Sequence, residues 1–434
     1  MRFVSTRGAA PPATLSEAVR RGAATDGGLY LPEMLPALDP ALYDPGEGLA
    51  EFAQSFLRPF FEGDPLASEL PGICAEAFNF PLPLVVPDKA RPTLHALELF
   101  HGPTGAFKDF GARFLMACFD RLGVRGQPST ILVATSGDTG GAVGCAAEGR
   151  RSVRAIILFP QARVSPFQEQ QLTCWGAPVE AIEVEGDFDD CQRLVKAAFA
   201  DPKLTERHKL TSANSINIGR LLPQVAYIAH AALKMFIGTG RKPGVIVPTG
   251  NLGHGLAVLL ARAMGMPVGP VVLATNANRT LKQWAESGSY EPRPAVATIA
   301  NAMDVGAPSN FERLSALAEP EREVRVELVD DETIRRRIAK EFDQSGYIWC
   351  PHSATAVEAY ARLPDNERRA HPWIVAATAH PYKFREVIEP LIGREVQPPP
   401  ALAAIFDRRT RKSSIPASLG ALGEALKVSE TVSG

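Results

Sequence analysis

The sequence predicts an α/β fold built on open parallel sheets covered by helices. From about residue 92 onward, short apolar runs alternate with longer amphipathic segments, which is the pattern that βαβ units produce. Several apolar runs end in glycine-rich or hydroxyl-rich segments, at the strand ends where ligands bind in such sheets. Hydrophobic residues make up 45% and charged residues 22% of the 434 residues, as is usual for a folded globular chain.

The first part of the chain differs from the rest. It is rich in proline and glycine, and its amphipathic pieces are short. Residues 15–21 and 49–61 have helical periodicity, and residues 26–36 read as a turn and loop. We therefore expect a small N-terminal subdomain ahead of the α/β part.

The alternating elements come in two series. The first has strands over 94–99, 130–134, 153–159 and 179–184, and helices over 107–122, 140–148, 166–175 and 187–200. The second has helices over 219–237 and 253–264, and strands over 244–248, 271–274, 324–328 and 374–377. Residues 288–310 are expected to be irregular, and residues 395–415 to form a loop with a basic end.

Charge and cysteine usage exclude several classes of protein. With 46 basic and 48 acidic residues the net charge is −2, and no basic stripe suggests a nucleic-acid partner. No uninterrupted apolar run of about 18 residues suggests a membrane span, and the N-terminus does not resemble a secretion signal. The six cysteines form no CxxC pair, so neither a metal site nor a disulfide framework is expected. The expected location is the cytoplasm.

The first segment with chemical character is residues 101–111. Lys108 lies there among aromatic and small residues, at the start of a predicted helix. A helix N-terminus and apolar surroundings both disfavour the ammonium form, so the pKa of this lysine should fall. A neutral amine is what nucleophilic attack on a carbonyl requires. A surface lysine at a helix start fits the same pattern.

Residues 134–141 join a predicted strand to a helix and carry hydroxyls and glycines. Free backbone N–H groups at such a helix start form an anion site suited to a carboxylate or phosphate. An ordinary helix cap in a tight turn has the same composition. Residues 248–255 also join a predicted strand to a predicted helix. Their three glycines let a phosphate approach the backbone. Neither segment has the spacing of a dinucleotide or P-loop motif.

Two further segments end in groups that could bind a ligand. Thr378 follows the strand at 374–377 and could donate to a ring nitrogen, although a strand-end hydroxyl often only satisfies backbone. Residues 212–220 are polar and end in Arg220, and arginine binds phosphate through paired hydrogen bonds. An arginine in the first turn of a helix is also often merely solvated.

Together these segments resemble threonine synthase. The resemblance rests on Val4-Ser5-Thr6-Arg7-Gly8 with residues 26–32, on residues 100–111 around Lys108, and on residues 378–381. Residues 134–140, 214–224, 248–253 and 309–313 follow in the family's order, so it covers nearly the whole chain. The lysine motif and the N-terminal segment are specific to the family, whereas the glycine loops are shared with other pyridoxal-phosphate enzymes.

The resemblance implies the fold type II architecture of pyridoxal-phosphate enzymes. Two open three-layer α/β domains would hold pyridoxal 5'-phosphate between them, next to an N-terminal subdomain. Residues 1–92 would form that subdomain, 93–112 with 209–434 the large cofactor-binding domain, and 113–208 a smaller inserted α/β domain.

The resemblance also implies a role for each site residue. Lys108 would bind the cofactor covalently and act as the catalytic base. The other cofactor contacts would be Asp138, Gly250, Asn251, Leu252, Gly253 and Thr378. Thr135, Ser136 and Thr139 would hold the substrate carboxylate, and Ser215 and Arg220 its phosphate. Many relatives have Asn where Asp138 stands, so we expect this carboxyl to share a proton with the cofactor's phenolic oxygen.

The implied reaction is O-phospho-L-homoserine plus water giving L-threonine and phosphate, in an enzyme that is a monomer or a homodimer. A related phospholyase would give 2-oxobutyrate, ammonia and phosphate instead. A dehydratase acting on serine or threonine, a binding module without catalysis and a nicotinamide enzyme are more distant alternatives.

Overall fold

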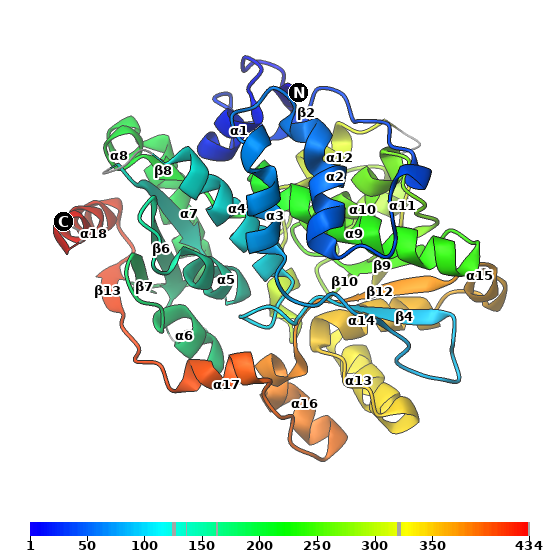
Figure 1. The fold of residues 1–434 in the computed structure, drawn as a ribbon. Helices are drawn as coiled ribbons and strands as arrows, with labels where there is room; N and C mark the ends of the chain where they lie inside the picture. Colours follow the sequence, from blue (N-terminus) through cyan, green and yellow to red (C-terminus); the bar gives the residue numbers. More distant parts are fainter. Residues whose placement is uncertain (124–126, 136, 162–163, 319–322, 433–434) are drawn as a thin grey trace.

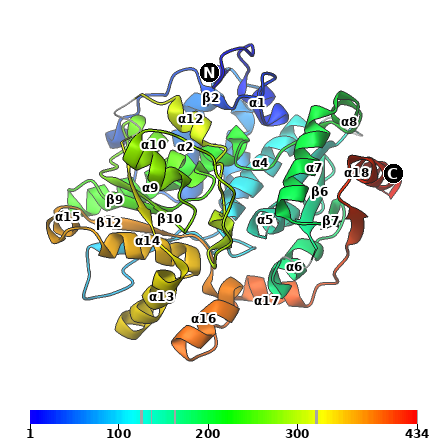
Figure 2. The same cartoon turned by 180° about the vertical axis from the view of Figure 1, so that it is seen from behind.

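The computed structural model describes residues 1–123, 127–135, 137–161, 164–318 and 323–432. Within these residues the strands form three sheets, which have six, five and two strands. Figure 1 shows the two larger sheets side by side, with the N-terminal helices above them, and Figure 2 shows the same arrangement from behind. The predicted alternation of strands and helices is confirmed.

The large sheet has the order β11-β10-β9-β12-β4-β3. Its strands are β3 (Leu84–Val85), β4 (Leu94–Glu98), β9 (Gly244–Pro248), β10 (Val271–Thr275), β11 (Arg325–Leu328) and β12 (Trp373–Ala377). All neighbours are parallel except β3, which runs antiparallel to β4. The central strands are buried throughout because helices cover both faces.

Alternate side chains of this sheet enter two different cores. Val245 and Val247 pack with α9 (Ile218–Thr239) and α10 (Gly253–Ala263), whereas Ile246 packs with α13 (Asp331–Ser345) and α14 (Pro351–Ala361). This is the consequence of the two-residue period of a strand. The sheet is therefore the middle layer of a three-layer unit.

The second sheet has the order β13-β7-β6-β5-β8 and is parallel throughout. Its strands are β5 (Ser129–Ala134), β6 (Val153–Pro160), β7 (Val179–Glu185), β8 (Leu210–Thr211) and β13 (Ser413–Pro416). The helices connected to it are α5 (Asp138–Ala147), α6 (Pro166–Thr173), α7 (Phe188–Ala200), α8 (Pro202–His208), α17 (Pro400–Phe406) and α18 (Leu419–Val432).

The C-terminal part departs from the sequence prediction. Residues 209–434 were expected to stay with the large domain, and residues 395–415 to form a loop. Instead β8 and β13 complete the smaller sheet, and α18 packs on α7 (Figure 1). Lys412 helps to hold this segment against the smaller sheet, because its Nζ donates to Glu183 Oε1 on β7 at 2.8 Å.

The other domain limits also shift. The expected boundary between residues 112 and 113 lies inside α4 (Lys108–Leu122), a continuous helix that packs against both α9 and α5. Residues 84–85, expected in the N-terminal subdomain, form β3 of the large sheet. The division into three parts stays a proposal, with these segments moved.

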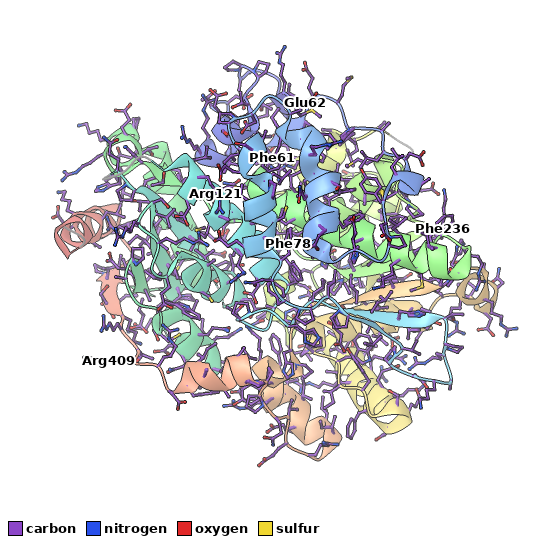
Figure 3. The ribbon with its side chains drawn as sticks, viewed as in Figure 1. Phe61, Glu62, Phe78, Arg121, Phe236 and Arg409 are labelled. Carbon is purple, nitrogen blue, oxygen red and sulfur yellow. The ribbon has the colours of Figure 1, made fainter. Side chains whose placement is uncertain are left out.

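The N-terminal part shares its core with the rest of the molecule. It holds β1 (Phe3–Ser5), β2 (Tyr30–Pro32), α1 (Leu15–Arg21), α2 (Leu49–Phe61) and α3 (Leu70–Ala77). The predicted helices 15–21 and 49–61 are confirmed at both ends. Phe114 on α4 lies 6.2 Å from the ring of Phe61 and 5.9 Å from that of Phe78, and Figure 3 shows Phe61 and Phe78 along the two neighbouring helices.

Helix α9 is the one helix of the described residues that is long and apolar enough to span a membrane. Of the apolar window, 78% is buried inside the protein, against α2, α4 and α10. This helix is therefore the central core helix of the large domain. The remaining shorter helices are α11 (Thr280–Ser287), α12 (Phe311–Ser315), α15 (Asp365–Ala370) and α16 (Arg385–Ile392).

The contact of Phe114 with the N-terminal helices gives a stability prediction. Phe114 is 1% exposed, so Phe114→Ala leaves a cavity at the junction and should cost about 3–5 kcal/mol. Urea unfolding followed by circular dichroism measures the loss as a lower midpoint. Leu42, which is 80% exposed, is the control, and Leu42→Ala should change stability by less than about 0.5 kcal/mol. Equal midpoints for the two variants would contradict the shared core.

Candidate active site

A cavity of about 310 Å³ lies where the carboxyl ends of strands from both larger sheets meet. Segments that follow β5, β8, β9 and β12 line it, together with the start of α4. The predicted residues in its wall are Lys108, Thr135, Thr139, Ser215, Arg220, Gly250, Asn251, Leu252, Gly253 and Thr378. Asp138 is buried at the start of α5, and Ser136 lies outside the described residues.

Backbone contacts bring Lys108 and Thr378 together from distant parts of the chain. The N–H of Phe107 donates to the carbonyl of Thr378 at 2.8 Å, and the N–H of His380 donates to the carbonyl of Gly105 at 2.9 Å. Ala106 and Ala379 form an antiparallel bridge between these two bonds. The first residue of α4 is thereby fixed beside the end of the central strand β12.

The electrostatic surroundings of Lys108 favour a neutral amine. Burial is the main cause that lowers its pKa, to about 8, and it is opposed by the nearby carboxylate of Asp138. The positive charges of Arg220 and Lys383 lower this pKa further. The sequence-based expectation of a depressed lysine pKa is thus met by the geometry. Such an amine can attack an aldehyde near neutral pH.

The loop after β9 is shaped for close approach of an anion. A Cβ on Gly250 would lie 2.7 Å from the Cα of Met303, so only glycine fits there. Leu252 has a left-handed backbone with φ of 65°, unusual for a residue with a side chain, and α10 begins directly after it. The N–H groups of the first helical turn have no partners within the helix and attract anions such as a phosphate.

A small network fixes the hydroxyl of Ser215 beside this loop. Its Oγ accepts from Asn251 Nδ2 at 2.8 Å and from Asn310 Nδ2 at 3.1 Å. Asn310 Nδ2 also donates to the carbonyl of Asn251 at 3.0 Å. Because both lone pairs of the hydroxyl are used, its own hydrogen is left to donate elsewhere. Asn310 was quoted in the sequence only as part of the family motif, and its bridging position was not predicted.

Arg220 is a buried cation at the edge of the cavity. Its Nη1 donates to the carbonyl of Ala213 at 2.6 Å, while its Nε has no hydrogen-bond partner among the described residues. Burial lowers the pKa of this guanidinium to about 10, and the nearby carboxyl of Asp109 opposes the shift. A buried arginine with spare donors is suited to an anionic ligand.

The hydroxyl of Thr135 is engaged within its own turn. Its Oγ1 accepts from the N–H groups of Gly137 and Gly140, both at 3.0 Å, and lies 3.1 Å from the carbonyl of Gly137. It therefore shapes the start of α5. Thr139 is the second residue of α5 and also lines the cavity. The roles of both threonines toward a substrate stay predictions.

Asp138 has a partner that the sequence did not reveal. Lys383, buried in the 3₁₀ helix Pro381–Phe384, places its Nζ 3.0 Å from Asp138 Oδ1. Burial favours the neutral carboxyl, but the charges of Lys383, Lys108 and His352 outweigh it and lower the pKa of Asp138 to about 2. The ammonium of Lys383 thus favours the ionised form of this carboxyl, and the proton expected between Asp138 and the cofactor's phenolic oxygen stays a prediction. The sequence signal that could have indicated this partner is a lysine between Tyr382 and Phe384, in the otherwise apolar segment Pro381–Phe384.

Two histidines of the cavity wall are neutral. Burial lowers the pKa of His254 to about 3, and its ring stacks on Phe107 at 4.9 Å. Burial also lowers the pKa of His352 to about 4, against the charge of Asp138. His352 Nε2 accepts from the N–H of Ala302 at 3.0 Å, which places the ring hydrogen on Nδ1. The wall therefore offers hydrogen-bond donors without adding positive charge.

These features fit pyridoxal phosphate. A partly buried amine of low pKa can attach an aldehyde, and the cradle at Gly250 with the α10 N-terminus can hold a phosphate. Thr378 stands at the end of β12 beside the attachment point.

Comparison with known proteins also indicates a pyridoxal-phosphate enzyme. The chain matches a family model described as pyridoxal-phosphate dependent enzyme over residues 82–376, and models of the threonine synthase N terminus and C-terminal part over residues 2–78 and 353–425. It is 37% identical to threonine synthase of Serratia marcescens, covering 95% of this chain and 96% of that protein. It is 39% identical to that of Haemophilus influenzae, covering 90% and 91%.

Solved structures of threonine synthases are also similar to this chain. The crystal structure of Escherichia coli threonine synthase matches with a TM-score of 0.88 at 34% identity, covering 99% of this chain and all of that one. The Brucella melitensis structure, described as threonine synthase with PLP bound, matches with a TM-score of 0.90 at 35% identity over 99% of each chain. The predicted fold type II architecture and pyridoxal-phosphate cofactor are confirmed, and the chain belongs to the threonine synthase family of pyridoxal-phosphate-dependent enzymes.

Proposed function

We propose that this protein converts O-phospho-L-homoserine and water into L-threonine and phosphate. One observation carries the proposal: a partly buried lysine with a pKa of about 8 lies in the same cavity as a helix N-terminus suited to an anion and a buried arginine with a spare donor. A cofactor phosphate and a substrate phosphate need two such anion sites.

The cofactor would be held by residues of both domains. Lys108 would attach it, the backbone of Gly250, Asn251, Leu252 and Gly253 would bind its phosphate, and Thr378 would donate to its ring nitrogen. Asp138 would lie toward its phenolic oxygen. When bound, pyridoxal phosphate supplies an aldehyde for covalent attachment and a ring that accepts the electron pair left when a carbon loses a proton.

The substrate would be held at both ends. Arg220 and the hydrogen of the Ser215 hydroxyl would bind its phosphate, and Arg220 would stabilise the charge that develops as phosphate leaves. Thr139, with Ser136 and the turn that Thr135 shapes, would hold its carboxylate at the start of α5. A substrate fixed in this way presents its α-carbon to Lys108.

Lys108 would carry the proton transfers. As a neutral amine it would remove the α-proton, and it is also the best candidate for moving the β-proton. The C–O bond at the γ-carbon then breaks and releases phosphate, and the γ-carbon gains a proton. Water adds its oxygen at the β-carbon, and the α-carbon regains a proton, so the product is threonine.

Two further features belong to the same proposal. We expect a monomer or a homodimer, and a cytoplasmic location. The six cysteines are free, in keeping with a reducing compartment.

The reaction is tested by incubating the purified protein with pyridoxal phosphate and O-phosphohomoserine. Phosphate is assayed, and the organic product is identified by mass spectrometry. Equal amounts of phosphate and threonine are expected. Phosphate with 2-oxobutyrate and ammonia would instead make the protein a phospholyase, and absence of phosphate release would refute the substrate.

Arg220→Ala should impair use of the phosphorylated substrate. The loss of a buried charge-assisted contact should cost roughly 2–5 kcal/mol, or about 30-fold to several thousandfold in kcat/KM. Arg220→Lys keeps the charge but loses the paired donors, so it should fall between wild type and Arg220→Ala. Steady-state phosphate release measures all three proteins, and unchanged kinetics of Arg220→Ala would remove this residue from the phosphate site.

The rate at which the apoprotein takes up pyridoxal phosphate should rise with pH, reach half of its maximum near pH 8 and level off above about pH 9. Only the neutral amine attacks the aldehyde, and the neutral fraction of Lys108 grows as the pH approaches its pKa of about 8. Stopped-flow absorbance between pH 6.5 and 9.5 measures this midpoint (about two units below an ordinary lysine). Lys108→Ala should show no such uptake. A midpoint near 10 would contradict the depressed pKa.

A further inference from the structure

Lys383 is a buried ammonium that makes two hydrogen bonds and one ion pair. It is 2% exposed, and its Nζ lies 2.7 Å from the carbonyl of Thr104, 2.5 Å from Gln171 Oε1 and 3.0 Å from Asp138 Oδ1. Two of the three ammonium hydrogens are therefore used in hydrogen bonds, and the ion pair with Asp138 is a third contact. The position of this side chain is therefore fixed.

The partners of Lys383 come from both domains. Thr104 lies in the loop that leads to Lys108, whereas Asp138 and Gln171 belong to α5 and α6 of the smaller domain. Gln171 Nε2 also donates to the carbonyl of Thr104, at 3.0 Å. The lysine thus holds the start of α5 against the loop that carries the reactive amine.

The contact between Lys383 and Asp138 affects the reactive amine because both charges act on the pKa of Lys108. The groups that act on Lys108 are Asp138 on α5, Arg220 on α9 and Lys383 itself. The other ionisable groups near Lys383 and Asp138 are Asp109 on α4, His352 on α14 and His380 before the 3₁₀ helix. Both histidines have a pKa lowered to about 4, so near neutral pH the cations facing Asp138 are Lys383 and, when protonated, Lys108.

Without Lys383, the carboxylate of Asp138 would be buried with Lys108 as its remaining lysine partner. A buried carboxylate beside an amine favours the ammonium form of that amine. The reactive lysine would then be held in the protonated form, which neither attacks an aldehyde nor removes a proton.

We propose that Lys383 is a positioning residue that serves as the fixed counter-ion of Asp138 and thereby leaves Lys108 free to act as a neutral amine. This inference rests on the proposed role of Lys108 and extends it to a residue outside the cavity wall. Asp138 and Lys383 form a matched pair: an ionised carboxyl at this position requires a cation that is not the catalytic base.

The experiment measures the pH midpoint of pyridoxal-phosphate uptake in four proteins: wild type, Lys383→Met, Asp138→Asn and the double variant. Lys383→Met removes a cation and leaves the carboxylate, and both effects raise the pKa of Lys108, so the midpoint should rise by about one unit or more. Asp138→Asn removes the carboxylate and should lower it. The double variant should return to within about half a unit of wild type.

A matched control separates this effect from loss of stability. Arg91 lies just before the amino end of β4, away from the cavity at the carboxyl ends, and it pairs with the buried Glu341, so Arg91→Met also breaks a buried ion pair. It should lower the thermal unfolding midpoint without moving the pH midpoint. Lys383→Arg keeps the charge and should stay within about half a unit of wild type.

The outcomes that would overturn the counter-ion role differ from those that would overturn the proposed role of Lys108. A Lys383→Met variant that is less stable but has an unshifted pH midpoint overturns the counter-ion role. If Lys383→Met is insoluble, recovery of soluble protein in the double variant supports the proposal, and equal insolubility overturns it. Failure of the proposed role of Lys108 would appear separately, as uptake in Lys108→Ala equal to that of wild type.

Discussion

The site depends on a short backbone contact between two segments far apart in the chain. Residues 105–107 and 378–380 are joined by two hydrogen bonds and a bridge, which fix the first turn of α4 against the end of β12. Because β12 is the central strand between β9 and β4, this contact also places the amine of Lys108 next to the loop after β9. The remaining ligand-binding segments take their positions from the sheets on which they end.

Burial has a different consequence for each charged group of the cavity. It lowers the pKa of Lys108 to about 8, which raises the neutral fraction of this amine near neutral pH, and it lowers the pKa values of His254 and His352 to about 3 and 4, which keeps both rings neutral. Arg220 has a pKa of about 10 and stays charged. The site therefore combines neutral donors and bases with a permanent cation, and Asp138 and Lys383 offset each other.

The fold could be predicted largely from the sequence because its signals are local. The helices 15–21 and 49–61 follow from amphipathic periodicity, and strands such as β9 follow from short apolar runs that end at glycine or proline. The prediction was wrong for the C-terminus. Strand β13 is short and mostly exposed, and only its pairing with β7 makes it a strand. Such pairing joins residues that are distant in sequence, so no local pattern carries it.

The sequence by itself determined the α/β class and located the candidate cofactor lysine and the candidate anion-binding loops, because each is written in a contiguous motif. Only the tertiary structure decided how these motifs combine. It showed that the Thr135 hydroxyl is used within its turn, that Asn310 orients Ser215, and that Lys383 neutralises Asp138. The physical reason is that a pKa or a hydrogen-bond partner depends on burial and on neighbours a few ångströms away, and in this protein those neighbours come from separate domains.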